Sequence, residues 1–277
     1  MALTTFLPTI WSARLLAHLD NAHVFANLVN REYEGEISAY GSSVKINQIG
    51  AVTAKKYTKN TDITAPEELS ATDKTLTINQ QDYFNFQVDD IDKAQARASV
   101  MDDAMRRAAY ALGEVSDKFL ANTMATGATI AIAGDTALTA ANIYETMVKF
   151  KVAMDKRNTP AMGRWIVLPP EAVGLIALDQ RFSNTAGQLG QDTVKNGWVS
   201  KAVGFDIYMS NNVPFASTGS KYTILAGTNM ACSYAEQIVE TEGYRMEKRF
   251  ADAVKGLHVY GATVTESEAI YKASVTF

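Results

Sequence analysis

The sequence predicts an α+β fold, and three observations carry this prediction. A long two-stranded hairpin spans residues 41–90, a long helix follows it directly, and a mixed series of shorter helices and strands occupies residues 128–239 before further strands. Strands and helices that occur in separate runs, without strict alternation, are typical of this class. The 277 residues, 47% apolar and 20% charged, suffice for one large core or two modest ones.

The first thirty residues contain two apolar groups. The first follows Pro8, which suits the first turn of a helix, and its members recur at helical spacing: Ile10, Trp11, Leu15, Leu16 and Leu19. The second group consists of Val24, Phe25, Leu28 and Val29. The chain does not start with a basic region and a continuous apolar run, so we expect no signal peptide.

The hairpin is predicted from alternation with a period of two. Apolar side chains of the return strand fall on even positions: Leu76, Ile78, Phe84, Phe86 and Val88. The first strand carries Val44, Ile46, Ile49 and Val52, with a slip near Gly50. The tip, residues 53–74, is polar and includes Lys55, Lys56, Lys59, Glu67 and Glu68. Such a hairpin is marginally stable alone and its edges favour pairing, so we interpret it as an arm that grips a neighbour.

A helix over residues 91–124 is expected next, capped by Asp89 and Asp90 and ended by Gly127. At 1.5 Å per residue it would be roughly 50 Å long, far above the mean for helices. Its apolar stripe is predicted to consist of Ile91, Ala94, Ala98, Met101, Met105, Ala108, Leu112, Val115 and Phe119. A helix of this length indicates a structural beam, which we call the spine helix.

The rest of the chain mixes elements. We expect helices over residues 143–154 and 171–178, the second opened by Pro169 and Pro170, and strands over 165–168, 205–209 and 222–225. A long loop rich in Gly, Asn, Gln and Thr covers residues 182–198. Residues 243–277 return to strand alternation, carried by Leu257, Val259, Tyr271, Ala273, Val275 and Phe277.

Residues that support catalysis or ligand binding are scarce. The formal net charge of −4 lacks the basic excess of nucleic-acid binders. Cys232, the single cysteine, is expected to be a small buried side chain, and His18 and His23 are badly spaced for a helical zinc site. His258 is expected on a solvated strand face. We find no Walker loop and no G-x-S-x-G motif, and therefore expect no enzyme activity, cofactor, metal site or membrane span.

The order of elements and several local stretches resemble the Hong Kong 97-like fold of tailed-phage capsid proteins, over nearly the whole chain. The stretches similar to the axial domain of that family are Trp165-Ile-Val-Leu-Pro-Pro-Glu, Gly204-Phe-Asp-Ile-Tyr-Met-Ser-Asn-Asn-Val-Pro214 and Tyr222-Thr-Ile-Leu-Ala-Gly. Those similar to its peripheral strands are Tyr244-Arg-Met-Glu-Lys-Arg-Phe and Val254-Lys-Gly-Leu-His-Val-Tyr-Gly261.

The resemblance implies four parts. They are an N-terminal arm over residues 1–40, an E-loop hairpin over 41–90, a peripheral domain with the spine helix over 91–127 and 240–277, and an axial domain over 128–239. It also implies a major capsid protein that forms hexamers and pentamers of an icosahedral head around double-stranded DNA, without sequence-specific binding. Expected partners are a separate scaffolding protein, a portal and a decoration protein, with assembly in the bacterial host cytoplasm and a final place in the virion.

The residues expected to make contacts between subunits lie in three places: the tip residues Lys55, Lys56, Lys59, Glu67 and Glu68, the hairpin residues Phe84 and Phe86, and the axial loop residues Gln188 and Trp198. We expect Phe84 and Phe86 to be buried on the neighbour or on the chain's own spine helix. Some relatives join a hairpin lysine covalently to an asparagine in the last peripheral strands. Residues 243–277 contain no asparagine, so a non-covalent grip is expected.

Two alternatives stay open. An encapsulin-like compartment has the same fold and holds a protein cargo in place of DNA. A phage enzyme or binding module is the alternative from another class, and it needs a cleft with converging polar groups, which the sequence does not indicate.

Overall fold

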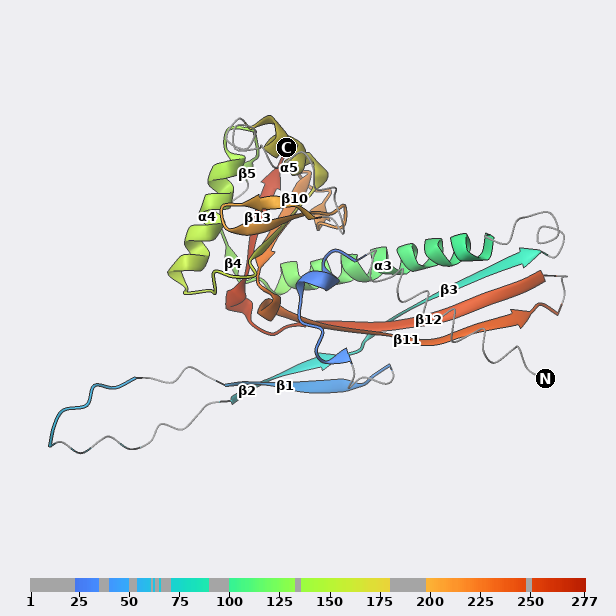
Figure 1. The fold of residues 1–277 in the computed structure, drawn as a ribbon, viewed down its shortest axis with the longest axis horizontal. Coiled ribbons are helices and arrows are strands. Elements are labelled where there is room, and N and C mark those ends of the chain that lie inside the picture. The colour runs from blue at the N-terminus through green and yellow to red at the C-terminus, as the bar shows by residue number, and fades with distance from the viewer. Residues whose placement is uncertain are drawn as a thin grey trace.

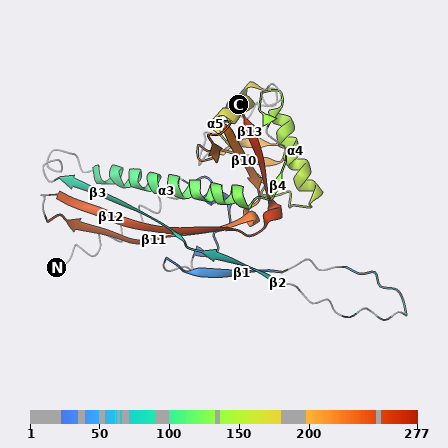
Figure 2. The same ribbon diagram turned by 180° about the vertical axis from the view of Figure 1, so that it is seen from behind.

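The computed structural model places the spine helix against one face of a long narrow sheet, while a hairpin arm lies against the other face and a mixed unit sits at one end (Figures 1 and 2). The structure describes residues 23–34, 40–49, 54–60, 62, 65, 71–89, 100–132, 136–179, 198–247 and 251–277. The predicted helix around residues 10–19, the slip near Gly50 and the caps of the spine helix involve residues outside these ranges.

The long sheet has three strands in the order β11-β12-β3, and all neighbouring strands are antiparallel. The strands are β3 (Gln80–Asp89), β11 (Cys232–Arg245) and β12 (Ala251–Val264). The spine helix α3 (Val100–Gly127) packs along this sheet and ends at Gly127, as predicted. Its buried residues include Met105, Ala109, Leu112, Ser116, Asp117, Leu120, Ala121 and Met124. Val115, expected in the stripe, is 46% exposed because the stripe advances by three or four residues per turn and passes through Ser116.

The predicted return strand of the hairpin is corrected by the structure, because it is two strands. The arm consists of β1 (Ser43–Ile49) paired with β2 (Ala71–Thr77), and of the segment between them. The strand that follows, β3, pairs with β12 of the long sheet. In both strands the even-numbered side chains are less exposed than the odd-numbered ones, so the period of two continues across the break at residues 78–79.

The mixed unit is built on an eight-stranded sheet, in the order β4-β13-β10-β6-β8-β7 with β5 beside β13 and β9 beside β10. Its strands are β4 (Ile130–Ala131), β5 (Thr136–Ala137), β6 (Trp165–Leu168), β7 (Trp198–Ala202), β8 (Phe205–Met209), β9 (Phe215–Ala216), β10 (Lys221–Gly227) and β13 (Ile270–Thr276). Two helices accompany it, α4 (Ile143–Lys156) and α5 (Pro170–Leu178). The strands predicted at 165–168 and 205–209 are confirmed.

Both faces of the eight-stranded sheet are covered, which explains the continuous apolar run of β6. Ile166 and Leu168 pack in a cluster with residues of α4 and α5. Trp165 and Val167 point to the other face, where they meet the C-terminal part of α3. A strand buried on both faces loses the alternation of a half-exposed strand.

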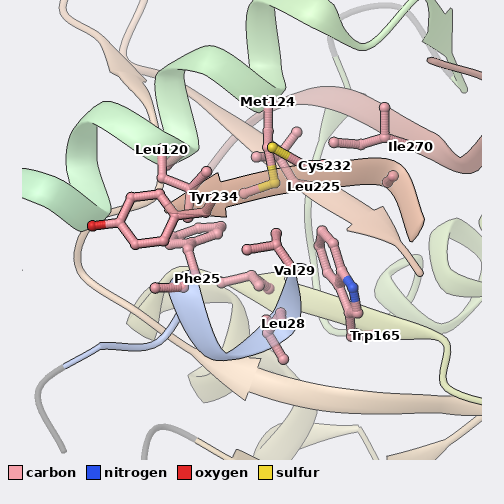
Figure 3. Close-up of a cluster of buried hydrophobic side chains, with 14 of the residues drawn as sticks. Phe25, Leu28, Val29, Leu120, Met124, Trp165, Leu225, Cys232, Tyr234 and Ile270 are labelled. Carbon is pink, nitrogen blue, oxygen red and sulfur yellow. The ribbon is translucent and has the colours of Figure 1, made fainter. Parts of the chain in front are cut away.

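One apolar cluster joins the N-terminal segment, the spine helix and both sheets (Figure 3). Leu28 is the last residue of the short 3-10 helix η1 (Ala26–Leu28), and Phe25 directly precedes this helix. Both side chains belong to the same cluster as Leu120 of α3, Trp165 and Tyr234. Two further 3-10 turns, η3 (Asn229–Ala231) and η4 (Ser267–Ala269), lie beside the strands that leave this cluster. The second apolar group of the N-terminus is therefore core.

The strand pairing differs from the expected grouping of residues 240–277. The last strand, β13, pairs with β10 in the eight-stranded sheet, and β11 begins at Cys232, inside the range expected for the axial part. The chain crosses between the two sheets three times, first through α3 and then at residues 228–231 and 265–269. The sequence shows the alternation along each strand, but it does not show with which other strand each one pairs.

Candidate assembly surfaces

The arm reaches away from the rest of the molecule, and three lysines lie within residues 54–60 of its tip. Residues 54–60 lie in the segment between β1 and β2, far from α3 (Figure 1). Lys55, Lys56 and Lys59 are exposed there, and Tyr57 is 67% exposed. Glu67 and Glu68 lie outside the described residues. The tip thus presents three lysines and an aromatic ring to whatever lies beside it.

The root of the arm is fixed to the long sheet. Ile46, Leu76 and Ile78 are buried and pack on Ala235 of β11 and Val259 of β12. The backbone N–H of Gly41 donates to the carbonyl of Ile78 at 3.0 Å, and the N–H of Ile78 donates to the carbonyl of Ser42 at 3.0 Å. These contacts give the arm a defined direction relative to the sheet.

A glycine permits the close approach of the two parts. A Cβ atom on Gly261 of β12 would overlap the carbonyl oxygen of Thr77 and lie 3.0 Å from the Cα of Ile78. The chain passes from β2 to β3 directly over this position. Any larger residue at 261 has to push the root of the arm away from the sheet.

Phe84 and Phe86 pack on their own chain. The two rings stack with their centroids 5.9 Å apart, and both lie against the cluster of Met105, Ala109 and Val254 between α3 and the sheet. The rings were expected to pack either on a neighbouring subunit or on the chain's own spine helix, and in the structure they pack on the spine helix. A Cβ on Gly256 would overlap the ring of Phe84, so the glycine makes room for it.

Of the two residues expected to make contacts in the axial loop, the structure describes only Trp198. Gln188 and most of the loop 182–198 lie outside the described residues. Trp198 is the first residue of β7, an edge strand that pairs with β8. The structure therefore brings the two phenylalanines together, and it places the tip lysines far from them.

A buried polar cluster was missed by the sequence analysis. His23, Asp117, Glu236 and His258 are all buried, so the expectation of a solvated His258 is wrong. The Nε2 atom of His258 lies 3.0 Å from Oε2 of Glu236, and Tyr234 donates its hydroxyl proton to the same oxygen at 2.8 Å. The hydrogen bond to this buried carboxylate satisfies the Nε2 atom of His258 in the interior.

The same cluster holds the N-terminal segment. Asp117 of α3 accepts hydrogen bonds from the backbone N–H groups of Val24, Phe25 and Ala26 at 2.8, 3.3 and 3.2 Å. Arg31 donates to Oε1 of Glu236 at 2.7 Å. Burial alone raises the pKa of Glu236, but hydrogen bonds from His23 and His258 outweigh burial and hold it well below its usual range.

Catalytic machinery is not apparent in the described ranges. Burial raises the pKa of the Cys232 thiol to about 12, which removes it as a nucleophile, and no group of His, Cys, Asp and Glu in those ranges could hold a metal ion. No helix in the same part of the chain is long and apolar enough to cross a membrane.

A pocket of about 260 Å³ opens between β3, β11 and β12, lined by Tyr83, Asn85, Glu242, Lys255, Gly256 and Leu257. Its polar side chains already form ion pairs and hydrogen bonds with neighbouring residues. Lys255 Nζ lies 2.8 Å from Glu242 Oε2, and Asn85 donates to the hydroxyl of Tyr244 at 3.3 Å. They do not converge on a substrate position, unlike the polar groups of a typical binding cleft.

Comparison with known proteins identifies the architecture. A family model described as phage capsid protein matches residues 71–273. A chain in the structure of Mycobacterium phage Che8 is 28% identical, with a TM-score of 0.72 over 91% of this chain and 90% of that one. Chains from the capsid of cyanophage P-SCSP1u and the mature capsid of bacteriophage PhiM1 are 16% and 15% identical, with TM-scores of 0.67 and 0.66. These two comparisons cover 93% and 92% of this chain and 87% of each of those chains. No curated protein sequence matches.

The family match runs from β2 to β13 and so includes part of the arm, the spine helix and strands of every sheet. The agreement in overall fold covers 91% of the chain and so extends beyond the residues of the family match. The predicted α+β class and the Hong Kong 97-like resemblance are confirmed, and the chain belongs to the phage capsid protein family.

Proposed function

We propose that the protein is the major capsid protein of a tailed phage, and that its subunits form hexamers and pentamers of an icosahedral head around double-stranded DNA. As a member of the capsid family it is a structural component of the virion that assembles with itself. The observation that supports the finer proposal best is the arm. It is rooted rigidly on the sheet, and its tip lies away from the core of its own chain.

The arm acts by lying over the next subunit around the ring. Beyond the root, β1 and β2 form a two-stranded sheet with open backbone edges, and such edges gain stability by pairing or by packing on another chain. The lysines of the tip add charge contacts, and Glu67 and Glu68 contribute the opposite sign. Phe84 and Phe86 serve indirectly, by fixing β3 on the spine helix.

Each of the two larger sheets forms the basis of one part of the subunit. The long sheet with α3 forms the peripheral part, and the eight-stranded sheet with α4 and α5 forms the axial part, whose loop with Gln188 and Trp198 faces the ring axis. Repeated heterologous contacts close into rings, and many weak contacts add up to a stable shell. A separate scaffolding protein guides assembly in the host cytoplasm, and a portal and a decoration protein complete the head.

Electron microscopy of purified particles tests this function. We expect closed shells whose capsomers average to rings of six and of five, with nuclease-protected double-stranded DNA inside particles from infected cells. Shells that hold a protein cargo and no DNA would favour the encapsulin-like alternative. A protein that stays monomeric at micromolar concentration, with or without the other head proteins of its phage, would contradict both kinds of shell.

A further inference from the structure

The buried polar cluster around His23 takes no part in the proposed arm contacts, and its geometry carries a separate inference. Nδ1 of His23 lies 3.2 Å from Oδ1 of Asp117, and Nε2 lies 3.2 Å from Oε2 of Glu236. A carboxylate can only accept hydrogen bonds, and a neutral imidazole has only one N–H group. Both contacts are satisfied together only when His23 is the doubly protonated imidazolium.

The charges of the cluster balance in that state. Asp117 and Glu236 are negative, and His23 and Arg31 are positive, with Glu34 on the outer side of Arg31. His258 donates from Nε2 to Glu236 at 3.0 Å, and its buried Nδ1 has no hydrogen-bond partner among the described residues.

The remaining polar groups around the cluster already have partners. The hydroxyl of Ser116 bonds to the carbonyl of Leu112 at 3.1 Å within α3, and that of Tyr260 bonds to Asp82 at 2.6 Å. Neither hydroxyl carries charge in the neutral range. Asp82 is the cross-strand partner of His258 where β12 pairs with β3, so its carboxylate lies at the His258 end of the cluster. The charged groups in contact with His23 itself are Asp117 and Glu236, and Arg31 contacts Glu236.

The cluster ties the N-terminal segment to the rest of the chain. Asp117 holds both His23 and the backbone N–H groups of the next three residues, while Glu236 holds His23 and Arg31. Loss of one proton from His23 leaves one ring nitrogen with a lone pair facing a carboxylate. That contact changes from attraction to repulsion in a buried site, where an unpaired charge is costly.

We propose that this cluster is a proton-dependent latch: the segment 23–34 stays docked on α3 and β11 while His23 is doubly protonated, and it is released when that proton is lost. Burial lowers the pKa of His23, but the hydrogen bonds to Asp117 and Glu236 outweigh burial and raise it from 6.5 to about 9. Because the pKa is raised on folding, the stabilisation is complete below pH 6.5 and is lost as the pH rises through about 9.

Hydrogen exchange of the full-length protein, followed by mass spectrometry between pH 6 and pH 10 and corrected for intrinsic exchange rates, tests the latch. We expect the peptide that covers residues 23–34 to lose protection with a midpoint near pH 9, while a peptide from α4 stays protected. In Glu236→Gln the midpoint should fall by about one pH unit or more, since one of the two carboxylates that hold the proton is neutral. Lys118→Gln removes an exposed pair with Glu114 on the same helix and should leave the curve unchanged.

His258→Gln keeps a donor near Glu236 and removes the other buried imidazole. The latch predicts the wild-type midpoint in this variant, and a midpoint that disappears would identify His258 as the switch and overturn the proposal. Equal midpoints in wild type and Glu236→Gln would also overturn it. If Glu236→Gln does not fold, the wild-type protein alone still tests the latch. Loss of protection in residues 23–34 and in α4 at the same pH would show that the whole subunit opens and not the segment alone, which would overturn the proposal.

Discussion

Gly261 of β12 lies so close beneath Thr77, the last residue of β2, that a methyl group on Gly261 would overlap the Thr77 carbonyl oxygen. The arm and the long sheet meet at this point, and the chain turns from one into the other within residues 78–79. The absence of a side chain at position 261 therefore sets how the arm leaves the body of the subunit.

Gly261→Ala should destabilise the subunit by about 1–3 kcal/mol, the usual cost of overpacking, because the obstacle is backbone and cannot rotate away. Thermal unfolding of the purified subunit measures the effect. Gly174→Ala is a matched control. Position 174 lies in α5 with open space around the new methyl group, and the change should be neutral or slightly stabilising, since alanine favours helix. A Gly261→Ala variant as stable as Gly174→Ala would contradict the close packing at the root.

Leu76→Ala tests whether the root holds the arm in place. Leu76 is fully buried against the long sheet, and its truncation should cost about 2–5 kcal/mol. Limited proteolysis should then cut the arm faster, because its docking is weakened. Asp73→Ala, at an exposed position of the same strand, is the control and should not change the cleavage rate. Equal cleavage in Leu76→Ala and wild type would show that the arm is held elsewhere.

Cys232 should be inert toward thiol reagents in the native subunit. It is fully buried, burial raises its pKa to about 12, and the thiolate is the reactive form. A colorimetric thiol assay should detect almost no reaction at pH 8 before denaturation and one thiol per chain afterwards, since the sequence has a single cysteine. Fast stoichiometric labelling of native protein would contradict the packing of the core in Figure 3.

The contacts between subunits should be non-covalent, because residues 243–277 contain no asparagine to join a hairpin lysine. Particles boiled in detergent should run as one band near the chain mass of 30.2 kDa on a denaturing gel. A ladder of larger bands would show that another residue forms a cross-link.

The sequence predicted well those elements whose pattern is decided locally. The strands at 165–168 and 205–209 have the predicted limits, and the spine helix ends at Gly127. The return strand was extended wrongly into β3, because Leu76 and Ile78 face the sheet at the arm root while Phe84 and Phe86 face the spine helix. Both halves keep a period of two, and periodicity does not say which strand is the partner.

The buried polar cluster could not be predicted, for a related reason. Asp117, Glu236 and His23 are polar, so each one alone is expected at the surface. Their burial depends on mutual pairing between residues 94 and 213 positions apart in the chain. Only the fold brings them together. The weak signal in the sequence was a serine and an aspartate, Ser116 and Asp117, within an otherwise apolar helix face.

Shortening the arm tests the assembly account most directly. Ile49 and Ala71 are directly paired, so residues 50–70 can be replaced by an Asn-Gly turn that closes the same hairpin without its tip. Electron microscopy and sedimentation, with the wild type and the other head proteins as reference, measure shell formation. We predict folded, soluble subunits with the wild-type thermal transition and few or no closed shells. Normal shells at the wild-type yield would contradict the proposal that the arm holds the capsid together.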